Sequence, residues 1–206
     1  MKPWFFDPHY QQPVADTGTT PTSLVQIRAA TTADLTGVVH IISESFHSQT
    51  GFWGWAFPLF RLGIYEDIRY RLTSPAPYHT CLVAVNTDAS GAKDVVGTIE
   101  VSLRFSDSWT YANKRYLYLS NLAVDLNYRR HGVASSLLIG CEKVCLEWGF
   151  EDIYLHVLED NHQARKLYYK LGYRVQEVEP PWSGFFLNRS RQLFLHKGIS
   201  GDPVLI

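Results

Sequence analysis

The chain has 206 residues, of which 46% are apolar and 19% are charged, which suits one globular domain and excludes a disordered chain. Its formal charge of -1, from 19 Lys and Arg against 20 Asp and Glu, excludes the broad positive field on which non-specific nucleic-acid binders depend. We find neither an apolar stretch of about 18 residues nor a signal-peptide core. We therefore expect a soluble cytoplasmic protein that binds neither nucleic acid nor membrane.

The three cysteines, Cys81, Cys141 and Cys145, form neither a CxxC pair nor the framework of a disulfide-rich domain. Cys141 and Cys145 lie four residues apart in an apolar helical pattern, where small core residues are commoner than metal ligands. The sequence therefore predicts no metal site and favours a reducing compartment.

The first 23 residues contain four prolines and show no hydrophobic period, which predicts an irregular N-terminal arm. Residues 24–206 carry regular patterns throughout, and we expect them to form a single domain. Its first half contains a strand, two helices and then three more strands that we expect to form an antiparallel meander. The predicted elements are a strand over 24–28, a helix opened by Thr31 and running to about 46, a helix over 59–72, and strands over 78–85, 95–103 and 116–124.

The second half begins with an amphipathic helix over 132–148, which Gly149 ends. A short strand follows at 153–158, so strand, helix and strand form a crossover that should be parallel and right-handed. A further helix over 161–171 is closed by Gly172, and two strands near 173–178 and 192–197 finish the chain.

The loop between the strand ending at Val124 and the following helix contains Arg129-Arg130-His131-Gly132-Val133-Ala134-Ser135. The first-turn N–H groups of a helix have no intrahelical acceptors, so such a helix start is an anion site. Gly132 allows close approach to the backbone, and the two arginines supply positive charge. The loop is neither a Walker loop nor a dinucleotide fingerprint, and two arginines before a helix are often only a solvated turn.

A second segment makes the loop more informative, because the two occur together in one family pattern. This segment is Asn161-x-x-Ala164-x-x-Leu167-Tyr168-x-x-x-Gly172-Tyr173. Together, the Arg-x-x-Gly-x-Ala loop and this segment resemble the GNAT superfamily of N-acetyltransferases, with the nearest likeness to its plastid and cyanobacterial members. The resemblance implies an α/β fold with a mixed, twisted sheet of about seven strands and helices on both faces. The central parallel strands 116–124 and 153–158 would splay apart to admit a cofactor arm.

The resemblance also implies acetyl-CoA as the co-substrate and places its contacts residue by residue. Backbone groups of Leu122, Ala123 and Val124 would pair with the pantetheine arm. Asn161 would contact the cofactor from the head of its helix, and Tyr168 on the same helix would contact it as well. The diphosphate would be bound by the arginine-rich loop, namely by Arg129 and by the amides of Arg130, His131, Gly132, Val133, Ala134 and Ser135.

Acetyl transfer needs a proton donor for the departing thiolate, and the resemblance assigns this role to Tyr168. A phenol with a reference pKa of about 10 can donate a proton to sulfur. The ordinary alternative is an aromatic side chain on a buried helix face. An oxyanion donor is expected among the backbone N–H groups near Leu122 to Val124, where the strands part.

The base that removes the amine proton has two candidates. His156 occupies the strand position where bacterial ribosomal-protein N-terminal acetyltransferases of the family carry Glu, and it is equally well explained as a satisfied core histidine. Glu100 could act through water, although an ordinary solvent-facing strand residue is the simpler interpretation.

The resemblance implies a protein α-amine or lysine as the acceptor, since some plastid and cyanobacterial members acetylate protein N-termini and lysines. Aromatic residues in two variable segments suggest a walled groove rather than a small acidic polyamine pocket. These residues equally suit a hydrophobic sub-core beneath long loops. A small-molecule amine acceptor and a non-catalytic acyl-CoA sensor are the alternatives, and a homodimer is left open. The aromatic residues are Phe52, Trp53, Trp55, Phe57, Trp182, Phe185 and Phe186.

Overall fold

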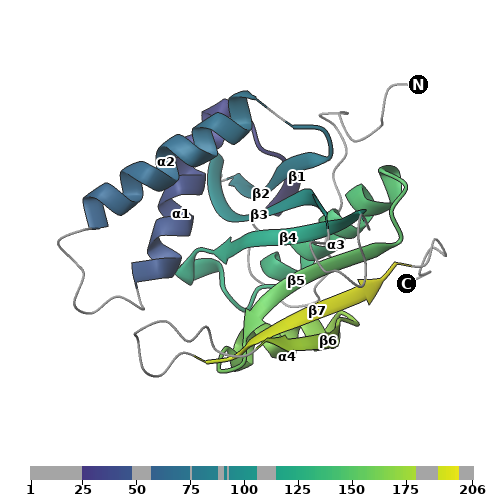
Figure 1. Cartoon of the computed structure of the whole chain (residues 1–206). Helices are drawn as coiled ribbons and strands as arrows, with labels where there is room; N and C mark the ends of the chain where they lie inside the picture. The colour runs from purple at the N-terminus through teal and green to yellow at the C-terminus, as the bar shows by residue number, and fades with distance from the viewer. Residues whose placement is uncertain are drawn as a thin grey trace. The chain divides into compact units, whose positions relative to one another are not determined.

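The computed structural model describes residues 25–47, 57–74, 76–87, 91, 93–105, 115–179 and 190–199 (Figure 1). The arm predicted for residues 1–23 lies outside them. Seven strands form one mixed sheet in the order β1-β2-β3-β4-β5-β7-β6, which confirms the predicted fold class. The elements are β1 Val25–Ala29, η2 Thr32–Asp34, α1 Leu35–His47, α2 Phe57–Thr73, β2 His79–Thr87, β3 Lys93–Phe105, β4 Arg115–Val124, η5 Leu126–Tyr128, α3 Val133–Glu147, β5 Asp152–Leu158, α4 His162–Lys170, β6 Arg174–Glu179 and β7 Gln192–Gly198.

The chain divides into two compact units. The first comprises the described parts of Met1–Ala76, Thr80–Ile99 and Asn121–Leu137, and the second those of Pro77–His79, Glu100–Ser120 and Leu138–Ile206. The single domain expected over residues 24–206 stays a prediction.

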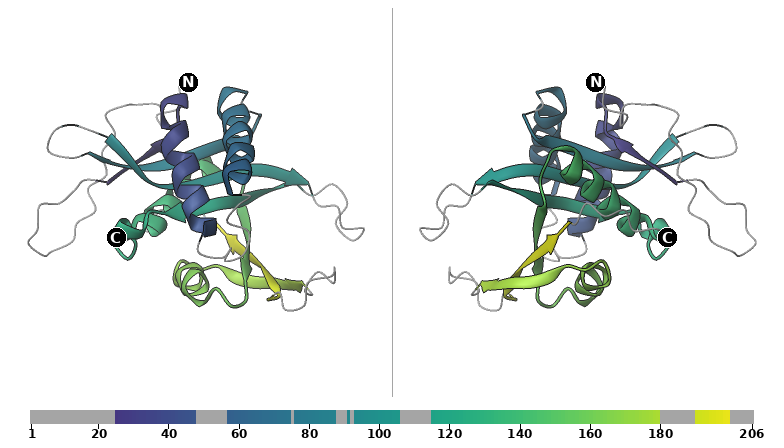
Figure 2. Two further views of the ribbon diagram at one scale, coloured as in Figure 1. Left: turned by 90° about the vertical axis from the view of Figure 1, so that its left-hand side faces the viewer. Right: turned by 90° about the vertical axis from the view of Figure 1, so that its right-hand side faces the viewer.

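In the first unit, two helices cover the strands and enclose a core. β1 pairs with β2 in antiparallel register, from Val25 opposite Asn86 to Ala29 opposite Leu82. Figure 2 shows α1 and α2 side by side on one face of these strands. The apolar stripe that predicts α1 from the sequence is the face that packs inward, because positions three to four apart share one side of a helix. The core consists of Leu35, Val38, Val39, Ile42, Ile68, Cys81, Val83 and Val85.

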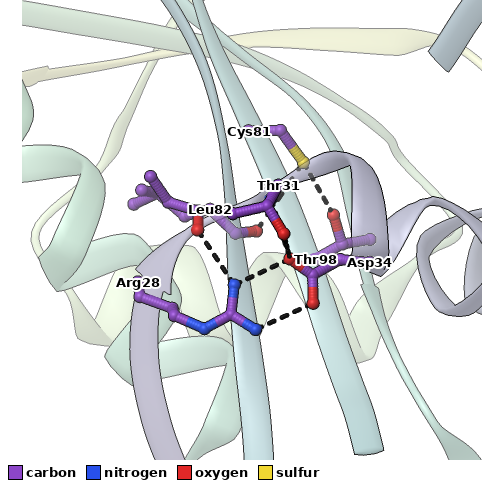
Figure 3. Close-up of polar contacts among 7 residues, drawn as sticks. Arg28, Thr31, Asp34, Cys81, Leu82 and Thr98 are labelled. Atoms are coloured by element: carbon purple, nitrogen blue, oxygen red, sulfur yellow. Dashed lines mark hydrogen bonds and ion pairs between the residues drawn. The ribbon is translucent and has the colours of Figure 1, made fainter. Parts of the chain in front are cut away.

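The entry into α1 is held by a buried carboxylate, as Figure 3 shows. Asp34 accepts bonds from both terminal nitrogens of Arg28, at 2.7 and 2.8 Å, and from the N–H of Thr31 at 2.7 Å. Burial acts to raise the pKa of Asp34, but the hydrogen bonds from Arg28 and Thr31 outweigh it and hold this pKa below its ordinary value. The turn predicted at Thr31 is therefore a capping box that is tied to β1 by an ion pair.

In the second unit, the last strand of the chain lies between two earlier ones. β7 pairs antiparallel with β5, from Asp152 opposite Gly198 to Leu158 opposite Gln192. It also pairs antiparallel with β6, with a register shift between Val175 and Glu177. Figure 1 shows β7 in yellow between β5 and β6. The hairpin of β6 and β7 thus extends the sheet from β5, and β6 is its edge strand.

Glycines end both helices that flank β5, as the sequence predicts. Gly149 has φ +75 and follows α3, and the N–H of Phe150 donates to the carbonyl of Cys145 at 3.0 Å. Gly172 has φ +92 and follows α4, and the N–H of Tyr173 donates to the carbonyl of Tyr168 at 3.0 Å. Both ends are Schellman motifs, in which glycine adopts the left-handed conformation at little cost.

The three cysteines are free thiols in buried positions, and burial raises the pKa of Cys145 to about 12. Among the described residues we find no group of three or more His, Cys, Asp or Glu side chains placed to hold a metal ion. None of the described helices combines the length and the apolar character that crossing a membrane requires.

Candidate active site

The arginine-rich loop in the first unit adopts a backbone shape that few residues tolerate. It begins with the short helix η5 and continues with Arg130 at φ +68 and Gly132 at φ +82. A positive φ is uncommon for a residue other than glycine and marks strain that often accompanies a functional site. Arg129, Arg130, His131 and Gly132 are all exposed, so their charge and backbone face solvent.

The loop leads into α3, whose start presents backbone donors. The first helical hydrogen bond runs from the N–H of Ser136 to the carbonyl of Gly132 at 3.0 Å. The N–H groups of the preceding turn, those of Val133, Ala134 and Ser135, therefore lie ahead of the helical ladder. Their position and the positive end of the helix dipole suit an anion.

A glycine that the sequence analysis did not single out holds this helix close to the sheet. A Cβ atom at Gly97 on β3 would lie 3.0 Å from Cγ1 of Val133 and 3.1 Å from Cδ1 of Leu137. It would also lie 3.3 Å from the carbonyl oxygen of Ala123. Because these contacts are tighter than normal packing, a larger residue at position 97 would require the neighbouring atoms to shift, whereas glycine allows the close approach of α3 to β3.

Arg129 links the loop to the end of β4. Its Nε donates to the carbonyl of Val124 at 3.1 Å. Leu122 and Val124 are half-buried, whereas Ala123 is buried. The predicted diphosphate loop and the predicted pantetheine strand are thus joined by a hydrogen bond within the first unit.

The ladder between the parallel strands β4 and β5 is short. It pairs Leu117–Leu119 with Ile153–Leu155, although β4 continues to Val124 and β5 to Leu158. Asn121 has φ +53, which interrupts the extended backbone of β4 two residues after the last pair. The early end of the ladder is what splaying predicts, and it leaves the backbone of β4 beyond Leu119 outside this pairing.

Tyr168 lies in the second unit on α4 and is 7% exposed. Its ring meets that of Tyr173 edge to face, with centroids 5.8 Å apart. Burial, with a smaller contribution from Tyr118, raises the pKa of Tyr168 to about 12. The phenol therefore stays protonated at neutral pH, which a proton donor requires.

His156 bridges two other side chains of the second unit. Its Nδ1 lies 2.9 Å from Oη of Tyr118 on β4, and its Nε2 lies 3.0 Å from Oε1 of Glu179 on β6. Phe194 on β7 stacks on the imidazole with centroids 4.7 Å apart. Both ring nitrogens of His156 have hydrogen-bond partners, as the alternative of a satisfied histidine requires. Its side chain is nevertheless 25% exposed and therefore accessible to solvent.

Tyr118, like Glu179, is a residue at this site that sequence reasoning missed. The guanidinium carbon of Arg104 lies 4.0 Å from the centre of its ring. Burial raises the pKa of Tyr118, and the charge of Arg104 partly offsets this effect. Because side chains alternate along a strand, the sequence indicates that Tyr118 faces the opposite side of the sheet from Leu117 and Leu119. No local sequence pattern indicates that Tyr118 contacts a histidine 38 positions later.

The interpretation of Glu100 as a solvent-facing residue is wrong. Its side chain is 2% exposed, and every residue of β3 from Val96 to Val101 is buried, so both faces of the strand are covered there. Oε2 of Glu100 lies 3.9 Å from Nε2 of His79. A proton from the acceptor amine could reach this carboxylate only through an intermediate group or a water.

The remaining predicted residues are partly described. Asn161 is the N-cap of α4, where its side-chain oxygen accepts from the N–H of Ala164 at 3.1 Å. The predicted acceptor-groove residues of 52–56 and 180–188 lie outside the described residues, as does the side chain of Phe57. Hydrogen bonds join Tyr118, His156 and Glu179 in the second unit, to which Tyr168 also belongs, while the diphosphate loop belongs to the first unit.

Comparison with known proteins supports the resemblance seen in the sequence. A family model described as "Acetyltransferase (GNAT) family" matches residues 39–173. GCN5-related N-acetyltransferase 10, chloroplastic, from Arabidopsis thaliana is 33% identical over 166 residues, which cover 77% of this chain and 65% of that protein. The chain thus spans slightly less than two thirds of the length of this relative.

Solved structures show the same fold. That of Arabidopsis thaliana NAA60 in complex with a bisubstrate analogue has a TM-score of 0.64 and 17% identity, covering 85% of this chain and 99% of that chain. Ribosomal-protein-alanine N-acetyltransferase from Brucella melitensis has a TM-score of 0.63 and 20% identity, covering 84% of this chain and 99% of that chain.

Proposed function

We propose that this chain, which belongs to the acetyltransferase (GNAT) family, transfers the acetyl group of acetyl-CoA to a primary amine. The first-choice acceptor is a protein N-terminal α-amine or lysine. The observation that carries the proposal is that the second unit holds both a buried neutral phenol at Tyr168 and the hydrogen-bonded pair of Tyr118 and His156. These groups have the chemistry of a proton donor and a proton acceptor.

The proton donor is Tyr168. When the amine attacks the thioester carbon, the C–S bond breaks and the thiolate takes the phenolic proton. A donor with a pKa of about 12 remains fully protonated between pH 6 and 9. Its register in the Asn161 to Tyr173 segment is the register that the family resemblance assigns to the acid.

The proton acceptor is His156, which acts through Tyr118. An α-amine or a lysine arrives mainly protonated, because the reference pKa values are about 8 and above 10. The ammonium gives one proton to Oη of Tyr118 while Tyr118 passes its own proton to Nδ1 of His156, across the 2.9 Å contact. The neutral amine then attacks the thioester, and the imidazolium returns its proton to solvent. Glu100, acting through a water, is the alternative base.

The acetyl-CoA contacts are proposed for the loop and strand of the first unit. The exposed arginines, the backbone at Gly132 and the start of α3 suit a diphosphate. The backbone of Leu122 to Val124, beyond the last pair of the β4–β5 ladder, suits the pantetheine arm and an oxyanion donor. The side-chain amide nitrogen of Asn161 is the group that remains for a cofactor contact, because the oxygen caps α4.

Two alternatives are separated by one assay. We expect the chain to release thiol from acetyl-CoA only when a peptide amine is present, and mass spectrometry of a peptide library to find the acetylated nitrogen. Transfer to a polyamine or an aminoglycoside but to no peptide would establish a small-molecule enzyme instead. Tight binding of acetyl-CoA with no turnover on any amine would refute the enzymatic proposal and leave an acyl-CoA sensor. The cytoplasmic location and the homodimer stay predictions.

A further inference from the structure

The contact between Glu179 and His156 has no part in the steps proposed above, and its geometry has a chemical consequence. A carboxylate only accepts hydrogen bonds, so the 3.0 Å contact with Oε1 of Glu179 requires a hydrogen on Nε2 of His156. A neutral imidazole carries only one hydrogen, and Nδ1 then holds a lone pair. The hydroxyl of Tyr118 is the donor to that lone pair, at 2.9 Å.

We propose that Glu179 is a positioning residue for the base: its carboxylate holds His156 in the Nε2–H tautomer, so that Nδ1 receives the proton that leaves through Tyr118. The inference rests on the proposed function for the identity of the base. After the transfer, Nδ1 carries the new proton and Nε2 keeps its own. The imidazolium is then paired with the carboxylate of Glu179, and no other reactant is needed.

The surroundings of His156 favour this role over a purely structural one. The ring plane is already set by stacking on Phe194, at 4.7 Å between centroids. β6 is held to β7 by its backbone ladder, in which Glu179 pairs with Gln192, so the strand does not need the carboxylate. The side chain of Glu179 is 43% exposed, and an ion pair at such a position contributes little to stability. The effect of the carboxylate is therefore to determine which of the two ring nitrogens carries the hydrogen.

The other polar groups near the ring of His156 do not select one of its tautomers. Tyr118 on β4 has a hydroxyl that can donate or accept, so it fits either tautomer. His196 on β7 is engaged with Asp152 at 2.6 Å, and its ring packs on Tyr154. Arg104 lies over Tyr118, and its cation favours loss of the Tyr118 proton toward His156. Among these described neighbours, only the carboxylate of Glu179 is restricted to one hydrogen-bonding role toward the imidazole.

The test replaces Glu179 by Gln, whose amide can either accept from or donate to Nε2. Glu177→Gln is the matched control, because it removes an equal charge from an exposed position of the same strand. The full chain is labelled with ¹⁵N-histidine, and the His156 signals are identified by their loss in His156→Ala. We expect the wild type and Glu177→Gln to show the Nε2–H tautomer, and Glu179→Gln to show a substantial Nδ1–H population.

The kinetic expectation is a drop in kcat/KM for the acceptor of about 3- to 10-fold in Glu179→Gln, with unchanged acetyl-CoA affinity. This drop is smaller than the roughly 10²- to 10⁴-fold loss expected when a general base itself is removed, because Glu179 only positions the base. Glu179→Asp keeps an acceptor-only group and should restore part of the loss. An unchanged tautomer in Glu179→Gln would overturn the inference and leave the proposed function intact. A changed tautomer with unchanged kcat/KM would overturn the catalytic role of Glu179. If the wild type acetylates no amine, the proposed function fails, and the tautomer measurement still decides whether Glu179 selects the ring nitrogen.

Discussion

Replacing Tyr168 by Phe removes one buried hydroxyl and keeps the rest of the side chain. The ring of Tyr168 packs edge to face on Tyr173 at 5.8 Å, and Phe retains this contact. The loss of one hydroxyl should change the free energy of unfolding at pH 7 by no more than about 1 kcal/mol. Any large change in activity is therefore chemical in origin.

The expected change in activity is large. Loss of a positioned proton donor should lower kcat by about 10- to 10⁴-fold, which raises the activation barrier by roughly 1.4 to 5.5 kcal/mol. The affinity for acetyl-CoA should not change, because the proposed diphosphate and pantetheine contacts belong to other residues. Tyr169→Phe is the matched control, since Tyr169 is the next residue of α4 and is half-buried; it should retain full activity.

The same substitution also predicts an effect on stability at high pH. Burial raises the pKa of Tyr168 to about 12, whereas an unfolded tyrosine ionises near 10. The folded state therefore keeps a proton that the unfolded state loses between these values. The corresponding stabilisation is present below pH 10 and is lost as the pH rises through 12, to a total of roughly 3 kcal/mol. In Tyr168→Phe, this part of the loss of stability at high pH is absent. The part due to Tyr173 remains, because burial also raises the pKa of Tyr173.

Three measurements check these expectations. A thiol-release assay gives kcat, calorimetry gives the acetyl-CoA affinity, and urea unfolding at pH 8, 10 and 11 gives the stability. Full activity in Tyr168→Phe would refute the assignment of the acid and revive the sensor alternative. An equal alkaline loss of stability in the wild type and the variant would refute the argument from burial.

Three further substitutions test other parts of the site and the fold. Gly132→Glu should abolish acetyl-CoA binding in calorimetry, because it adds negative charge at the helix start, whereas Gly132→Ala imposes the same strain at φ +82 without the charge and should still bind; unchanged affinity in a folded Gly132→Glu protein would disprove the diphosphate assignment. His156→Ala should remove the ascending limb of the pH profile of kcat/KM. A limb that persists in His156→Ala and disappears in Glu100→Gln would identify Glu100 as the base. Asp34→Asn should lower the free energy of unfolding by about 1.5 to 3 kcal/mol at pH 7, since the charge-assisted bonds from Arg28 are weakened. Because the pKa of Asp34 lies below its ordinary value, the difference from the wild type should shrink as the pH falls below about 4, and a pH-independent difference would contradict this reasoning.

The sequence by itself determined the elements of this fold and the family to which the chain belongs. The helices and their ends could be predicted closely, because the signals for them involve only residues near in sequence. These signals are the hydrophobic periods, the turn at Thr31 and the glycines at 149 and 172. The strand, helix and strand around α3 were likewise predictable, because a parallel crossover has few alternatives. The two motifs at 129–134 and 161–173 placed the candidate acid and the candidate diphosphate loop.

Only the tertiary structure decided what each side chain meets. The order of β5, β7 and β6 depends on pairing between segments distant in sequence, which no local pattern specifies. Glu100 is buried because both faces of its strand are covered in the folded chain, whereas its alternating sequence context suited an exposed face equally well. The contacts of His156 with Tyr118 and Glu179 join three strands, and their 38- and 23-residue separations leave no trace in a local pattern. Hydrogen-bond partners are set by the distance between atoms in the folded chain, and that distance is a property of the packing as a whole.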